Sequence, residues 1–119
     1  GARPNPKSPP PPGSQFVPKV FDYGRPDADS SSCAIGGVIY TGARLPALRG
    51  RYLFADYSMG ELYALSLSGT GPQTKGGDWR MIGSATYPVS LDTDAQGEVY
   101  ICCNDKADSG GTVLTLAPK

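Results

Sequence analysis

The sequence contains no histidine, carries no net charge and has no long hydrophobic run. Because histidine is the most common general base and zinc ligand, chemistry in this chain would depend on carboxylates, Lys, Tyr, Ser or Cys, or on a cofactor. Eleven Lys and Arg balance eleven Asp and Glu, so the charge gives no indication of nucleic-acid binding. The apolar runs have the length of strands, far below the roughly 20 residues that cross a bilayer, so no membrane insertion is expected.

Cysteine is scarce and its count is odd, with Cys33, Cys102 and Cys103 as the three thiols. Cys102 and Cys103 are neighbours on a predicted strand, so their side chains should leave opposite faces. At most one of them is therefore expected to form a disulfide with Cys33, which leaves a thiol that is buried and free or bonded outside the chain. The alternative is that the cysteines are small buried hydrophobic residues. No CxxC spacing indicates a metal site.

Residues 1–18 hold seven of the twelve prolines and are predicted to form an extended, polyproline-II-like linker. Ser8 and the four prolines after it resemble the Ser-Pro4 repeat of extensins, in which the prolines are hydroxylated and glycosylated and the segment is a stiff spacer. This resemblance implies O-glycosylation at Ser8, Pro9, Pro10, Pro11 and Pro12. The alternatives are an ordinary proline-rich linker and an SH3-type ligand.

Residues 19–119 show an all-β pattern without a helical period. Strands are predicted over residues 38–40, 51–55, 61–66, 79–82, 89–92, 99–103 and 112–116. Short strands at this spacing suit a sandwich, a barrel or a propeller. GELYAL at 60–65 and GEVYIC at 97–102 repeat one hairpin pattern 37 residues apart, close to the length of a propeller blade. Since a propeller needs about four to eight blades, the chain is predicted to be part of one.

Three stretches carry a family resemblance: CAIGGVIYTG at 33–42, LPALRGRYLFADY at 45–57 and GELY at 60–63. They resemble the C-terminal part of the glucose/sorbosone dehydrogenase family, which includes soluble quinoprotein sugar dehydrogenases and hedgehog-interacting-protein-like proteins. The resemblance covers about residues 18–117. It implies a six-bladed β-propeller, of which this chain would supply the last one to two blades.

Four residues are assigned structural roles: Asp56, Gly36, Gly37 and Gly60. Asp56 follows an apolar run and belongs to the pattern of the family. A buried Asp at this point is expected to accept backbone N–H groups and to hold one blade to the next.

The enzymes of the family bind pyrroloquinoline quinone (PQQ) and calcium and oxidise aldose sugars, with the catalytic histidine and the calcium ligands in earlier blades. The resemblance places their basic quinone contacts near Ser58, Thr86 and Pro88, and none of these residues is basic. A tricarboxylate without opposing cations would be poorly held. The chain is therefore predicted to be non-catalytic and to hold no cofactor, and calcium or PQQ would need a site in the missing blades.

Asp92 and Asp94 resemble the first half of a calcium loop, but an EF-hand would need a bidentate Glu where Cys103 stands. A tight hairpin turn is the favoured interpretation. Among the aromatic residues, Tyr57 and Tyr87 are predicted to lie in turns and are the best candidates for exposed contacts with sugar. Most of the others are expected in the core: Tyr40, Tyr52, Phe54, Tyr63, Trp79 and Tyr100.

These observations predict a non-catalytic, extracellular propeller segment with a structural or adhesive role in a cell-surface or matrix assembly, binding carbohydrate or protein. Its partners would be the remaining blades, in the same or another polypeptide, together with matrix proteins or glycans. One alternative is the C-terminal part of a PQQ-dependent aldose sugar dehydrogenase. Another is a secreted ligand-binding antagonist of the hedgehog-interacting-protein type.

Overall fold

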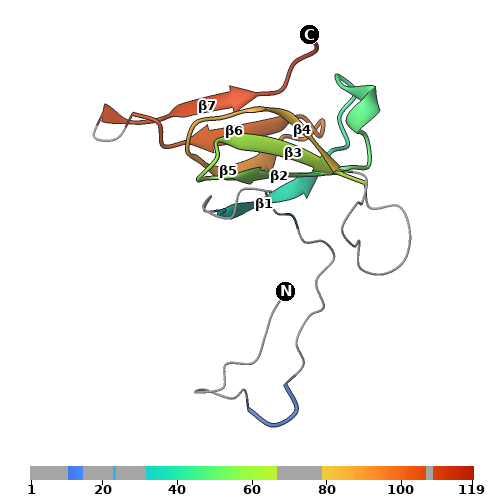
Figure 1. Ribbon diagram of the computed structural model, residues 1–119. Coiled ribbons are helices and arrows are strands. Elements are labelled where there is room, and N and C mark those ends of the chain that lie inside the picture. The colour runs from blue at the N-terminus through green and yellow to red at the C-terminus, as the bar shows by residue number, and fades with distance from the viewer. Residues whose placement is uncertain (1–10, 15–22, 24–31, 67–78, 107–108) are drawn as a thin grey trace.

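The structure is a computed structural model that describes residues 11–14, 23, 32–66, 79–106 and 109–119, and these residues form an all-β fold. A short 3-10 turn, η1, spans Pro46–Leu48 between the first two strands. The strands (Figure 1) are β1 (Ala34–Ile39), β2 (Tyr52–Asp56), β3 (Glu61–Leu65), β4 (Trp79–Ser84), β5 (Pro88–Thr93), β6 (Val99–Cys103) and β7 (Thr112–Thr115). Each strand predicted from the sequence is present, β6 with the predicted bounds and the others with one or both ends shifted.

The largest shift concerns β1, which is predicted over 38–40 and begins at Ala34 instead. The pair Gly36 and Gly37 therefore lies inside the strand, where the register with β2 shifts as at a β-bulge. A Cβ on Gly37 would overlap the carbonyl oxygen of Leu53, whereas no atom lies close to the corresponding position on Gly36. Gly37 thus allows the backbones of β1 and β2 to approach each other.

The strands form two antiparallel sheets, which we call sheet I (order β1-β2-β3-β4) and sheet II (order β5-β6-β7). In both sheets each strand pairs with the next one along the chain, so the connections are hairpins and not crossovers. Between the sheets, β5 packs against β1 and also contacts β2 (Figure 1).

Side chains alternate between the two faces of sheet I along β2 and β3, and both faces are covered. This explains why both strands are buried after their first residue. One set of side chains faces sheet II and forms a common core with it: Leu53, Ala55, Leu62, Ala64, Leu91, Val99, Ile101 and Cys103. The other set, Phe54, Tyr63 and Leu65, packs with Tyr23, Tyr52 and Trp79 on the opposite face of sheet I. A strand buried on both faces reads as a continuous apolar run, as YLFA does here.

The position of β5 against β1 changes the interpretation of the internal repeat. β1 is the first strand of sheet I and β5 the first strand of sheet II, and the two sheets meet through these strands. Counted from this contact, β5, β6 and β7 take the positions of β1, β2 and β3. The sequence repeat instead pairs 60–65 on β3 with 97–102 on β6. The repeated pattern therefore encodes the exit from a glycine turn into a strand, since Gly60 and Gly97 both have positive φ, 67° and 82°.

In the proline-rich segment, the structure describes only residues 11–14. These are not extended: the N–H of Ser14 donates to the carbonyl oxygen of Pro11 at 3.1 Å, with Gly13 at φ 84°. The prediction of an extended segment is wrong at this point, because Pro12 followed by Gly13 favours a type II turn. Ser8, Pro9 and Pro10 lie outside the described residues. In the part of the chain that is described, no helix has the length and apolar character that a membrane span requires.

Candidate binding sites at the two ends of sheet I

Sheet I places different connections at its two ends, because neighbouring strands run in opposite directions. The β2–β3 turn lies at the same end as the segment between β4 and β5. The β1–β2 connection, which contains η1, lies at the opposite end (Figure 1). Each end presents one candidate site.

At the first end, the β2–β3 turn lies against the segment between β4 and β5. The N–H of Ala85 donates to the carbonyl oxygen of Gly60 at 2.9 Å. The rings of Tyr57 and Tyr87 meet with centroids 5.2 Å apart and planes tilted by 40°. Tyr87 is 47% exposed. Its φ is 52°, and among the described non-glycine residues Tyr87 is the one with a positive φ. The structure thus brings the two tyrosines together as one pair, in which Tyr57 is half-buried and not exposed as predicted.

The three positions compared with quinone contacts lie beside this tyrosine pair. Ser58 belongs to the β2–β3 turn, and Thr86 and Pro88 flank Tyr87 in the sequence. Ser58 and Thr86 are exposed, whereas Pro88 is buried at the start of β5. This end of sheet I therefore offers hydroxyl groups and aromatic rings, and none of the three residues offers a cation.

Asp56 is completely buried at the end of β2 and organises the same turn. Its carboxylate accepts hydrogen bonds from the Tyr23 hydroxyl at 2.6 Å and from the N–H groups of Cys33 at 3.3 Å and Met59 at 3.0 Å. Burial on its own would raise the pKa of Asp56, but these hydrogen bonds outweigh it and hold the pKa below its ordinary value. The pKa of Tyr23 is raised, first by burial and then by its bond to Asp56.

The carboxylate that joins the two sheets belongs to Glu98, whose role could not be predicted from the sequence. Glu98 precedes β6 and accepts from the Tyr40 hydroxyl at 2.6 Å and from the N–H groups of Ala43 and Arg44 at 3.2 Å. The Tyr40 oxygen also accepts from the N–H of Leu45 at 2.9 Å. The bond from Tyr40 is the main reason that the pKa of Glu98 lies below its ordinary value. The donors to Asp56 described above, by contrast, lie in the β2–β3 turn of sheet I or before β1.

Tyr40→Phe is expected to lower the free energy of unfolding by about 1–3 kcal/mol, because it removes a buried hydrogen bond to a charged group. The variant also leaves the N–H of Leu45 without its acceptor. Urea unfolding followed by fluorescence would measure the loss. The matched control is Tyr100→Phe, whose exposed hydroxyl donates to Asp94 at 3.2 Å and should contribute little. Equal losses in the two variants would contradict this role of Tyr40.

The two carboxylates compared with a calcium loop are placed as a hairpin turn would place them. One oxygen of Asp94 accepts from the N–H groups of Gln96 at 2.9 Å and Glu98 at 3.0 Å, and the other from Tyr100. Asp92 is exposed on β5. Within the described ranges, no group of three or more Cys, Asp or Glu side chains is arranged to hold a metal ion.

All three cysteines carry free thiols in the structure, and the expected disulfide is not formed. Cys33 is exposed before β1, whereas Cys103 is 5% exposed in the shared core. Burial, together with Asp105 and Cys102, raises the pKa of the Cys103 thiol. Cys103 therefore has the character of a small core hydrophobe.

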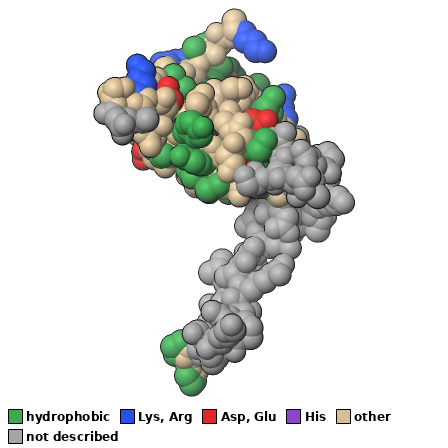
Figure 2. All heavy atoms as spheres, turned by 60° about the vertical axis from the view of Figure 1, so that its left-hand side comes forward, with side chains coloured by type: hydrophobic (Ala, Val, Ile, Leu, Met, Phe, Trp, Pro, Cys, Tyr) green, Lys and Arg blue, Asp and Glu red, His purple; other side chains and the backbone are tan. Residues whose placement is uncertain are grey.

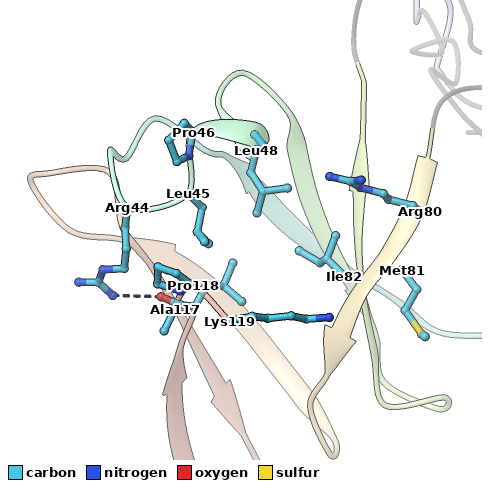
Figure 3. Close-up of a pocket in the computed structure, with 12 residues that line it drawn as sticks. Arg44, Leu45, Pro46, Leu48, Arg80, Met81, Ile82, Ala117, Pro118 and Lys119 are labelled. Carbon is cyan, nitrogen blue, oxygen red and sulfur yellow. Dashed lines mark hydrogen bonds between the residues drawn. The ribbon is translucent and has the colours of Figure 1, made fainter.

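At the second end of sheet I, a groove of about 510 Å³ lies between η1, β4 and the residues after β7 (Figure 3). We call it the groove. Its lining consists of Arg44, Leu45, Pro46, Ala47, Leu48, Arg80, Met81, Ile82, Leu116, Ala117, Pro118 and Lys119. Arg44 donates to the carbonyl oxygen of Leu116 at 3.0 Å, which fixes the final segment beside η1. No feature of the sequence pattern pointed to this groove, because its three walls are far apart along the chain.

Comparison with known proteins gives no relative: no protein-family model, curated protein or solved structure matches this chain.

Proposed function

We propose that this chain is part of a non-catalytic, extracellular six-bladed β-propeller with a structural or adhesive role in a cell-surface or matrix assembly. Sheet I would be one blade and sheet II most of the next, with the remaining blades supplied by the same or another polypeptide. The site of adhesion would be the pair Tyr57 and Tyr87, which binds carbohydrate.

The observation that carries this proposal is the pair formed by the exposed Tyr87 and the half-buried Tyr57. Two tilted rings with centroids 5.2 Å apart present an apolar surface edged by hydroxyl groups, which suits the face and the hydroxyls of a sugar ring. Tyr87 is held in a left-handed backbone conformation that side chains rarely adopt. Such outliers concentrate at binding sites, and here it places the ring beside Tyr57.

Two further features support the propeller. Sheet I is a four-stranded antiparallel meander, which is the composition of a propeller blade. Sheet II repeats the first three strands of this arrangement and packs on sheet I through the first strand of each. A stack of this kind extends by adding further sheets.

Polysaccharide binding tests the proposal. The full chain would be co-sedimented with insoluble cellulose, insoluble xylan and arabinogalactan immobilised on beads, and binding to at least one is expected. Tyr87→Ala should abolish most of it, since stacking on a ring contributes roughly 1 kcal/mol or more. The matched control is Tyr100→Ala, which removes another exposed tyrosine. Retention by Tyr87→Ala at the level of Tyr100→Ala would overturn the assignment of the site.

Two other measurements test the location and the lack of catalysis. Mass spectrometry of residues 1–18 from the natural source should find hydroxyproline and arabinose, and unmodified prolines would contradict the matrix role. After incubation with PQQ and calcium, the chain should not reduce a redox dye when glucose is added. Quinone-dependent dye reduction would revive the sugar-dehydrogenase alternative.

A further inference from the structure

The residues that line the groove are either apolar or basic. Nine of its twelve lining residues are apolar and the other three are Arg44, Arg80 and Lys119. No lining residue has an aromatic ring, and no lining side chain has an oxygen acceptor, the thioether sulfur of Met81 being a weak one. A sugar needs acceptors for its hydroxyl groups and is commonly stacked on a ring, so the groove does not suit a neutral carbohydrate. It suits an anion that carries an aliphatic group.

One wall of the groove is a strand edge. β4 is the outermost strand of sheet I and its partner is β3. Three consecutive residues of β4, Arg80, Met81 and Ile82, line the groove. Because successive side chains leave opposite faces of a strand, a hollow that touches all three runs along its edge. Ile82 has no register partner on β3, since the pairing shifts there, and this bulge turns its side chain against the core at the base of the groove.

The three cations are not equivalent. The guanidinium of Arg44 is engaged by the carbonyl oxygen of Leu116 and approaches the Thr115 hydroxyl at 3.5 Å, so it has a structural task. Arg80 and Lys119 are exposed. In Figure 3 they reach over the groove from its opposite walls, Arg80 from β4 and Lys119 from the final segment. Figure 2 shows Lys and Arg side chains at the margins of the face in view, beside hydrophobic atoms.

We propose that the groove binds an extended acidic peptide from a partner protein. An aliphatic side chain of the peptide enters between Leu45, Leu48 and Ile82, and carboxylates on either side of it pair with Arg80 and Lys119. The peptide runs along Arg80–Ile82 of β4, the outermost strand of sheet I, as a strand added to the edge of a sheet would. This occupant follows from charge complementarity, from the apolar base and from the strand edge, and it is independent of the tyrosine pair.

Fluorescence anisotropy with the full chain tests this proposal. The probe is a fluorescein-labelled short peptide in which Glu alternates with Leu, and saturable binding that weakens with added salt is expected. Arg80→Gln and Lys119→Gln should each weaken binding about two- to fivefold, as for an exposed ion pair, and the double variant about tenfold. The matched control is the double variant Arg49→Gln/Lys106→Gln, which removes the same charge from exposed positions outside the groove and should bind normally.

The groove and the peptide can each be changed in a way that leaves the fold alone. Ala47→Glu adds a negative charge at an exposed lining position and should weaken binding at least as much as Arg80→Gln. Peptides with Gln for Glu, or with Ser for Leu, should bind weakly. The proposal is overturned if the Gln peptide binds as well as the Glu peptide, if the two double variants behave alike, or if polygalacturonate competes better than the peptide. None of these outcomes affects Tyr87-dependent binding to polysaccharide, so the two proposals fail separately.

Discussion

Gly97→Ala is expected to destabilise the chain by about 2–5 kcal/mol, the largest effect of any conservative substitution considered. Gly97 has a φ of 82°, where a side chain costs roughly 1–2 kcal/mol. A Cβ at this position would also overlap the Thr41 hydroxyl and lie 2.8 Å from the backbone nitrogen of Gly42. Overpacking against a backbone adds about 1–3 kcal/mol.

Gly50→Ala separates the two causes. Gly50 has nearly the same φ, 81°, but no atom lies within 4 Å of the position of its Cβ. This variant should therefore lose only the conformational part, roughly 1–2 kcal/mol. Chemical denaturation of both variants gives the comparison. Losses of equal size would mean that the segment around Thr41 moves aside, and that the packing of Gly97 against it has no energetic importance.

Asp56→Ala is expected to cost about 2–4 kcal/mol, because it leaves buried donors without an acceptor. These donors are the Tyr23 hydroxyl and the N–H groups of Cys33 and Met59. Asp92→Ala is the matched control, since Asp92 is exposed on β5, and its stability should change by less than about 0.5 kcal/mol. Denaturant unfolding of the two variants in parallel is the measurement, and similar midpoints would contradict the structural role of Asp56.

The Asp56 carboxylate also makes the stability of the fold depend on pH under acidic conditions. The pKa of Asp56 is lower in the folded state than its ordinary value of about 3.9. Its ionised form is therefore favoured by folding, and its contribution is fully present above about pH 3.9 and is lost as the pH falls through the folded-state pKa. The pKa of Glu98 is lowered as well, so it adds to the same loss on acidification. Asp56→Asn should flatten this part of the profile while keeping one acceptor oxygen.

Most of the local structure could be predicted from the sequence, because alternation and turn residues act over a few positions. The strand at 99–103 and the glycine turns at Gly60 and Gly97 are examples. The β-bulge at Gly37 could not be predicted, since it depends on the close approach of a carbonyl group from another strand. For the same reason, the sequence repeat suggested equivalent blade positions for β3 and β6, whereas packing matches β6 with β2.

The candidate sites, too, could be predicted from the sequence only in part. Tyr57 and Tyr87 were predicted as separate turn residues, and their contact follows only once the β2–β3 turn meets the segment after β4. Asp56 was expected to hold one blade to the next, and its bonds join the β2–β3 turn to Tyr23 and Cys33, which precede sheet I. Glu98 joins the sheets instead, and its sequence context is the same as that of Glu61, which starts β3. A shared motif could not distinguish a joining carboxylate from an ordinary strand residue.

The bond between Tyr40 and Glu98 has a consequence for the order of folding. Its two residues are 58 positions apart, whereas each hairpin joins strands that are near neighbours along the chain. Closing a long loop lowers the entropy of the chain, and this cost arises before the contacts that the loop allows can stabilise the fold. We therefore expect the hairpins to form early and the junction of the two sheets to form late. Interactions that form after the transition state mainly control the rate of unfolding, so this junction would determine how long the assembled pair of sheets persists.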